Sequence, residues 1–179
     1  MDFEIVTDSC CNLLEDMIDD FGIHVLPLTF MVDGEDEVYQ SYLKGERTDL
    51  KQFYTMMREG KVFKTSLPNL AESEALFREL LGSGRDVLYI AFSSGLSGTY
   101  QALSLMAAQL QEEFPERKIH VVDSLAASGG QGLLVWYAVQ HARAGESIDQ
   151  VRDWLEENKL HLAHWFTVDD LMFLFRGGR

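Results

Sequence analysis

Residues 87–92 form an uninterrupted apolar run, Val-Leu-Tyr-Ile-Ala-Phe, which constrains the fold more than any other feature of the sequence. Strands that are apolar at every position are typical of parallel sheets, because helices cover both of their faces. Further strands are predicted at residues 3–7, 23–30, 118–122 and 160–168, and helical patterns separate them. This alternation indicates an α/β fold, with a mainly parallel β-sheet flanked by helices.

Helices are predicted at residues 13–21, 48–58, 70–81, 99–114, 126–144, 148–157 and 169–175. Asn12 is a suitable N-cap for the first helix, and either Thr48 or Asp49 for the second. Pro27 lies inside a predicted strand, where its missing N–H is tolerated only at an edge or a bulge. Residues 32–46 are acidic and are predicted to be irregular. We expect the 179 residues to form one domain, 1–179.

The charge of the chain excludes several classes of partner. Its net charge of −14, from 15 basic and 29 acidic side chains, repels phosphate backbones, so nucleic acid is not an expected partner. No apolar run approaches the ~20 residues that span a bilayer, so no integral membrane segment is expected. Cys10 and Cys11 are adjacent and unsuited to a disulfide framework, which favours reduced thiols and a cytoplasmic location.

The loop at residues 93–99, Ser-Ser-Gly-Leu-Ser-Gly-Thr, carries the strongest signal for a binding site. A strand, a small polar loop and a helix N-terminus follow one another in the order that makes an anion site from backbone N–H groups. Ser97 is equally suited to capping the helix. The loop lacks the lysine of a Walker A motif, and its second glycine comes one position too early for a hydrolase elbow.

Hydroxyl and carboxylate groups follow the other predicted strands and loops. Thr65 and Ser66 stand just before a helix and would supply hydroxyl donors, or simply form a capping turn. Asp8-Ser9 and Asp123-Ser124 both come directly after a strand, on the edge of an α/β sheet where ligands bind. Asp8 and Asp123 are also the kind of residue that anchors loop N–H groups.

Metal and hydrolase chemistry are the other functions weighed. The five histidines, His24, His120, His141, His161 and His164, show no metal spacing except in the 161/164 pair, which falls on a predicted strand, so we expect no metal and no cofactor. A serine hydrolase acting on small esters or acyl phosphates through Ser97, with His120 or His141 as base, is the alternative function.

Taken together, these motifs resemble the DegV family. The resemblance rests on Thr7-Asp8-Ser9, Lys64-Thr65-Ser66-x-Pro68, residues 93–101, Val122-Asp123-Ser124, Ala127-Ser128-Gly129-x-Gln131-Gly132 and residues 168–179, which occur in the family's order over the whole chain. It implies a fatty-acid-binding protein rather than an enzyme. Some DegV-like proteins are the acyl-presenting subunit of a bacterial fatty acid kinase, which makes acyl phosphate for phospholipid synthesis.

By this resemblance, Thr65 and a serine of the 93–97 loop, Ser97 first and Ser94 second, hold the carboxylate of a long-chain fatty acid. Ser66 lies beside them, and Asp8, Ser9, Asp123 and Arg176 support the site or contact a partner kinase. The acyl chain would run between layers of the core.

Family members continue past Arg176-Gly177-Gly178-Arg179 into a second domain that helps enclose the ligand. We therefore expect residues 169–179 to be a linker-like helix and loop towards that domain. The chain alone is expected to bind fatty acid weakly, or to associate with another copy through the face left uncovered.

Overall fold

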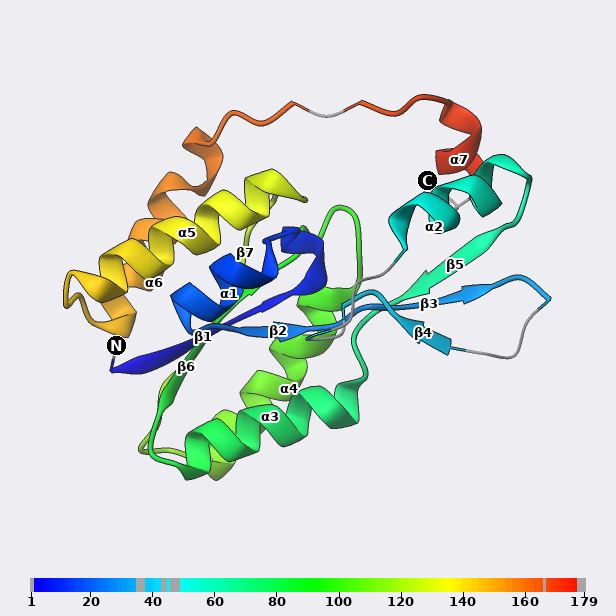
Figure 1. The fold of residues 1–179 in the computed structure, drawn as a ribbon. Helices are drawn as coiled ribbons and strands as arrows, with labels where there is room; N and C mark the ends of the chain where they lie inside the picture. The colour runs from blue at the N-terminus through cyan, green and yellow to red at the C-terminus, as the bar shows by residue number, and fades with distance from the viewer. Residues whose placement is uncertain (1, 35–37, 43–44, 46–48, 166, 177–179) are drawn as a thin grey trace.

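A four-stranded parallel sheet forms the centre of the protein, as the apolar runs predict (Figure 1). The computed structural model describes residues 2–34, 38–42, 45, 49–165 and 167–176, without the side chains of residues 50, 173, 174 and 176. The strands lie in the order β2-β1-β6-β7, with β1 at Phe3–Asp8, β2 at His24–Leu26, β6 at Asp86–Ala91 and β7 at Ile119–Asp123.

Helices cover both faces of this sheet (Figure 1). Helices α1 (Glu15–Phe21), α5 (Gly129–Arg143) and α6 (Ile148–Asn158) pack on one face, and α3 (Leu70–Gly82) and α4 (Thr99–Glu113) pack on the other. Leu88 and Ile90 of β6 point into the first core, whereas Val87 and Tyr89 point into the second. Because both faces of β6 are buried, the strand is apolar at every position.

A second, antiparallel sheet stands beside the first and was not predicted. Its order is β4-β3-β5, with β3 at Thr29–Val32, β4 at Val38–Gln40 and β5 at Phe63–Ser66. Helix α2 (Leu50–Arg58) packs on it through an aromatic cluster in which Phe53 lies 4.6 Å from Phe63 and 5.4 Å from Phe30, measured between ring centroids. The cluster supplies this small sheet with a core of its own.

Three predictions about this region are wrong. The strand predicted at residues 23–30 is broken at Pro27, and its two halves, β2 and β3, belong to different sheets. Residues 63–66, predicted as a polar loop, form β5, and the segment predicted to be irregular contains β4. Proline cannot donate to a ladder, so the chain leaves the parallel sheet there.

The C-terminal part also differs from the prediction. The strand predicted at residues 160–168 is wrong: a 3-10 helix, η2 (Lys159–His161), is followed by a segment without strand assignment and by α7 (Leu171–Arg176). Figure 1 shows this segment passing from α6 to α7, which lies beside α2. Within the described ranges, no helix combines the length and apolarity needed to cross a membrane.

Two predicted helix caps have different outcomes. The Asp49 carboxylate accepts a hydrogen bond from the Gln52 N–H at 2.9 Å and caps α2, as predicted. Asn12 does not cap α1, which begins after Leu14 without a side-chain cap. It ends a 3-10 helix, η1 (Ser9–Cys11), in the left-handed conformation with φ of 50°.

Candidate functional site

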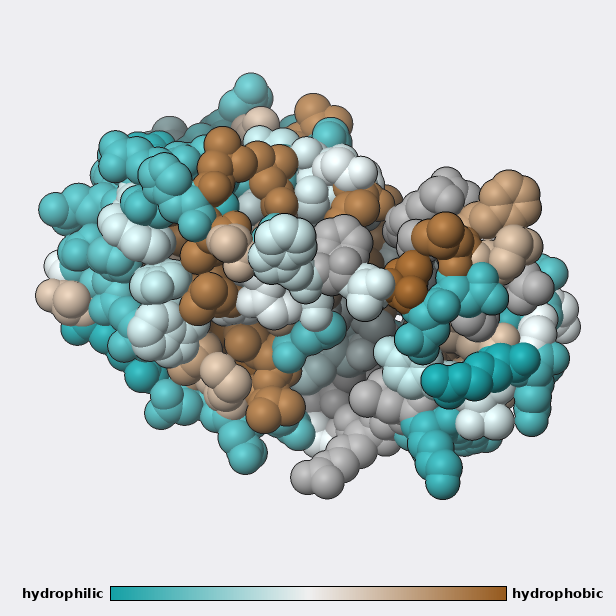
Figure 2. Space-filling model, turned by 90° about the horizontal axis from the view of Figure 1, so that it is seen from above, coloured by the Kyte–Doolittle hydropathy of each residue, from teal (hydrophilic) through white to brown (hydrophobic). Residues whose placement is uncertain are grey.

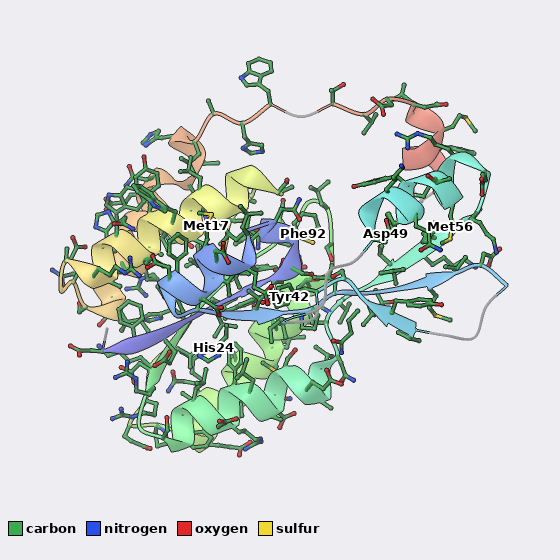
Figure 3. The ribbon with its side chains drawn as sticks, viewed as in Figure 1. Met17, His24, Tyr42, Asp49, Met56 and Phe92 are labelled. Atoms are coloured by element: carbon green, nitrogen blue, oxygen red, sulfur yellow. The ribbon has the colours of Figure 1, made fainter. Side chains whose placement is uncertain are left out.

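A pocket of about 250 Å³ lies where the parallel sheet meets the small sheet, and we call it the junction pocket. Hydroxyl groups of Ser9, Thr29, Ser41 and Thr65 line it. Its other lining residues are Cys10, Asn12 and the apolar Leu28, Phe30 and Phe53. In Figure 3, Asp49 and Met56 mark α2 on the small-sheet side, and Met17 and His24 mark the parallel-sheet side. The pocket thus combines polar donors with an apolar wall.

Two of the four hydroxyls are bonded to each other across the pocket. Ser9 Oγ and Ser41 Oγ are 2.6 Å apart, and Ser9 Oγ also accepts a hydrogen bond from the Leu28 N–H at 3.0 Å. These bonds join the end of β1 to the chain on either side of β3. Ser9 therefore holds the two sheets together at the same place where it lines the pocket.

Thr65 stands on β5 directly opposite Phe30 of β3. Its side chain is exposed, and among the described residues its hydroxyl has no hydrogen-bond partner. Ser66, the next residue, pairs with Thr29 and is not among the residues that line the junction pocket. Of the predicted site residues, Thr65 and Ser9 are the two that line this pocket.

Several amides of the 93–99 loop, where the sequence predicts an anion site, already donate to acceptors within the loop. The amides of Leu96 and Ser97 donate to the Ser93 carbonyl, and that of Gly95 donates to the Ser93 hydroxyl. Ser97 Oγ accepts from the Thr99 N–H at 3.2 Å and is 2.8 Å from the Thr99 hydroxyl. These bonds occupy the amides of Gly95, Leu96, Ser97 and Thr99.

Neither Ser94 nor Ser97 lines the junction pocket. The structure therefore does not bring Ser97 and Thr65 together in this pocket: Ser97 follows the end of β6, whereas Thr65 lies within β5 of the small sheet. Ser97 is not the N-cap of α4: Gly98 holds that position without a side-chain cap, and the Ser97 hydroxyl accepts from the N–H of Thr99, the first residue of the helix.

Asp8 is fully buried and anchors the end of β1. One of its carboxylate oxygens accepts from the Cys10 N–H at 3.1 Å and from Gln131 Nε2 at 3.2 Å. The other accepts from the Tyr89 hydroxyl at 3.0 Å and from the Phe92 N–H at 2.8 Å. Burial raises the pKa of Asp8, and these four hydrogen bonds oppose that rise.

Asp123 anchors the other loop. A single oxygen, Oδ1, accepts from the Ser94 N–H and the Leu125 N–H, each at 3.1 Å. Asp8 and Asp123 therefore fix the backbone around the site rather than facing the junction pocket. Arg176 ends α7, and its side chain and residues 177–179 lie outside the described part of the chain.

The histidines do not assemble a base or a metal site in the described residues. His120 Nε2 lies 2.7 Å from an Asp149 oxygen, and His141 Nδ1 lies 2.8 Å from a Glu146 oxygen, whereas Ser97 is bonded to Thr99. The residues that the structure describes contain no group of three or more His, Cys, Asp or Glu side chains that could hold a metal. Cys11 is buried, which raises the pKa of its thiol to about 11 and keeps it protonated.

The sequence analysis missed most of the apolar wall and Ser41. Leu28 and Phe30 were placed in a single strand with residues 23–26, and Ser41 in an irregular segment. Two signals in the sequence point to them. Pro27 separates two apolar stretches, and the aromatic pair Phe53-Tyr54 on α2 needs an apolar partner.

The comparisons with known proteins identify the family. The DegV family model, described as an uncharacterised protein family, matches residues 2–179. This chain belongs to the DegV family. A DegV domain-containing protein of Clostridium perfringens is 43% identical over 177 residues, which are 99% of this chain and 60% of that protein.

Two solved DegV structures share the fold. One is a DegV family protein of Thermus thermophilus, for which fatty acid binding is described. It superposes with a TM-score of 0.84 at 34% identity, over 100% of this chain and 61% of that one. DegV of Bacillus subtilis, described as a fatty acid binding protein, gives a TM-score of 0.81 at 30% identity, again over 100% and 61%. This DegV chain thus spans less than two thirds of the length of these relatives.

Proposed function

We propose that this chain binds a long-chain fatty acid, with the carboxylate at the hydroxyl groups of the junction pocket and the acyl chain against its apolar wall. The observation that carries the proposal is the lining of the pocket, in which Thr65 stands directly opposite Phe30. The fatty acid binding of the Thermus and Bacillus relatives supports the same ligand class.

The chemistry of the lining suits a fatty acid better than a phosphate ester. Among the described residues, those that line the pocket include no lysine or arginine, so a carboxylate would be held by hydroxyl donors rather than by a formal positive charge. A hydrogen bond to a charged group contributes about 1.5–3 kcal/mol. Leu28, Phe30 and Phe53 would cover the first methylene groups, each of which contributes about 0.8 kcal/mol when buried.

The serines of the neighbouring loop complete this proposal. Ser97, with Ser94 as second choice, would reach the carboxylate from the end of β6, while Asp123 fixes the loop through the Ser94 N–H. Ser66, Asp8, Ser9 and Arg176 would support the site or contact a partner. A small rotation of the Ser97 hydroxyl away from Thr99 would free it as a donor.

Presentation of the carboxylate to a kinase is the next part of the proposal. Thr65 is exposed, so the polar end of the pocket would be open to a second protein. A fatty acid kinase catalytic subunit with ATP should form acyl phosphate, trapped as hydroxamate, only when this protein is present. If hydroxamate forms equally well without this protein, the protein does not present the fatty acid to the kinase. That result would not bear on whether it binds the fatty acid.

The proposed hydrogen bond from Thr65 to the carboxylate is tested by Thr65→Val, which removes the hydroxyl and keeps a β-branched side chain suited to a strand. The matched control is Thr55→Val on α2, where the hydroxyl donates to the Lys51 carbonyl outside the pocket. Calorimetry with palmitate should show at least about tenfold weaker binding for Thr65→Val alone, from the loss of about 1.5–3 kcal/mol. Equal affinities for the two variants would show that Thr65 does not hold the ligand.

A further inference from the structure

Among the described Asp and Glu residues, Asp8 is the one whose side chain is fully buried. The sequence has 29 acidic side chains, and Figure 2 shows hydrophilic side chains over much of one face of the molecule. Asp8 instead ends β1 inside the fold, beside the junction pocket. Burying a carboxylate is costly unless the charge is paired and hydrogen-bonded. The partners of Asp8 therefore decide how this charge is tolerated.

The four hydrogen-bond donors to Asp8 are electrically neutral. They are the N–H groups of Cys10 and Phe92, the Tyr89 hydroxyl and Gln131 Nε2, at 2.8 to 3.2 Å from the carboxylate oxygens. We call Asp8 and these four donors the Asp8 cluster. Within the part of the chain that the structure describes, no lysine, arginine or histidine is among the groups that act on this carboxyl. Its charge is therefore stabilised by dipoles alone.

The other titratable groups that face Asp8 hold their protons. Burial, and then the charge of Asp8, raises the pKa of the Tyr89 hydroxyl on β6. Burial likewise raises the pKa of the Cys11 thiol on η1 to about 11. Cys10 adds a second thiol from η1, and Gln131 of α5 adds an amide, which does not titrate. Since thiols ordinarily ionise near 8.5, Asp8 is the group here that exchanges a proton below about pH 8.

The Asp8 cluster also contains an acceptor that lacks a donor. Gln131 Nε2 donates to Asp8 and, at 3.1 Å, to Thr7 Oγ1. Oε1 of the same amide is buried and has no hydrogen-bond partner among the described atoms. A carboxylate can only accept hydrogen bonds, whereas a protonated carboxyl is also a donor. Protonation of Asp8 would thus bring into the cluster the kind of group that it lacks.

Asp8 is next to the groups that would bind the ligand. Ser9 and Cys10 line the junction pocket, and the Cys10 N–H donates to Asp8 Oδ1. The described lining of the pocket includes no lysine or arginine. A fatty acid carboxylate would therefore bring a second negative charge close to the first, with no cation between them. Where two carboxylates share a site, the pair keeps a proton to a higher pH than either group would alone.

We propose that a fatty acid anion binds at the junction pocket together with a proton from solvent, which Asp8 holds in the complex. This inference rests on the proposed fatty acid binding and adds the residue that balances the ligand's charge. Asp8 does not touch the ligand and is a positioning residue. Because the anion favours protonated Asp8, the affinity is highest at low pH. It falls as the pH rises from the pKa of Asp8 in the free protein to that in the complex.

Calorimetry in two buffers of different ionisation enthalpy measures this proton without any substitution. Between about pH 5.5 and pH 8, where free carboxyls are ionised, palmitate binding should take up part of a proton. Hexadecan-1-ol, which carries no charge, should bind without proton uptake. The palmitate affinity should fall with rising pH, by at most about tenfold per pH unit for one proton. Palmitate binding without proton uptake, or equal uptake with both ligands, would overturn the coupling. No palmitate binding at any pH would instead overturn the proposed function.

The variant Asp8→Asn assigns the proton. It should bind palmitate without proton uptake and with an affinity that stays within about twofold over the same pH range, because asparagine does not titrate. The matched control is Asp86→Asn at the opposite end of β6, where the carboxylate accepts from the Lys118 N–H at 3.0 Å, and this variant should keep the uptake of the parent. A purely structural role for Asp8 would weaken binding at every pH and leave the uptake in place, and that result would overturn the proposal.

Discussion

Replacing Asp8 with asparagine should destabilise the fold far more than the same replacement at Asp123. Asp8 uses both carboxylate oxygens, each of which accepts two hydrogen bonds from buried or partly buried donors. Asparagine keeps one oxygen and replaces the other with an NH₂ group, which cannot accept. Asp123 uses one oxygen for both of its bonds, so asparagine can keep them.

The size of the effect follows from the donors that lose their acceptor. If the remaining oxygen serves Tyr89 and Phe92, the NH₂ group faces Gln131 and the Cys10 N–H. Gln131 Nε2 keeps its hydrogen bond to Thr7 Oγ1 at 3.1 Å and loses the one to Asp8. The Cys10 N–H then stays unpaired, which costs about 1–3 kcal/mol.

Thermal unfolding by circular dichroism is the assay. A loss of about 2 kcal/mol lowers the Tm of a domain of this size by roughly 4–8 °C, and Asp123→Asn should lower it by less than about 2 °C. Equal losses for the two variants would refute the hydrogen-bond reasoning. An undiminished Tm for Asp8→Asn would show that the four bonds do not stabilise the end of β1.

The pH dependence gives a second measurement on the same pair. Burial raises the pKa of Asp8 above the value of 3.8 expected in an unfolded chain, so the folded protein holds the proton more tightly. The stability from this group is therefore fully present below about pH 4 and is lost as the pH rises through the folded pKa. Since asparagine does not titrate, the deficit of Asp8→Asn should be larger at about pH 4 than at about pH 8.

Three further predictions concern other parts of the chain. The pKa of Asp149 is lowered to about 2 by hydrogen bonds from Lys118 and then His120, so its contribution is present above pH 3.8 and lost as the pH falls towards 2. Urea titrations should find Asp149→Asn less stable than the parent at neutral pH, by under about 1 kcal/mol because the pair is exposed, and equally stable near pH 2. Ser97→Ala should lower the free energy of unfolding by about 1 kcal/mol, because the Thr99 N–H loses its acceptor. A fluorophosphonate probe should leave the parent protein unlabelled, and labelling at Ser97 would support the hydrolase alternative instead. Phe53→Ala should weaken both palmitate binding and the small sheet, the latter by about 2 kcal/mol for a half-buried ring, and unchanged hydrogen exchange in β3 and β5 would contradict this.

The parallel sheet could be predicted because its signals are local. Strands β1 and β6 are each a run of six consecutive residues, and polar residues stand at or just after the end of each. Helices α3 and α4 agree with their predicted ranges to within one or two residues for the same reason. Periodicity and glycine stops carry this information without any knowledge of distant contacts.

The small sheet could not be predicted because its pairing is long-range. Strands of three or four residues, such as β4 and β5, have too few positions for an alternation to stand out. Phe30 pairs with Thr65, which is 35 positions later in the sequence, and only the folded structure shows this pair. The candidate site could be predicted only in part for the same reason. Thr65 was found by its motif, whereas Ser41 and Phe53 reach the pocket only through tertiary contacts.

Mass spectrometry of the purified protein tests the central claim most directly. Lipid extracted from folded protein should contain long-chain fatty acids in the C14–C18 range that the family resemblance implies, and palmitate added to delipidated protein should bind and raise its Tm. The same preparation of Thr65→Val should carry less lipid, with an unchanged circular dichroism spectrum. A folded parent protein that yields no fatty acid and whose Tm does not respond to palmitate would contradict the account.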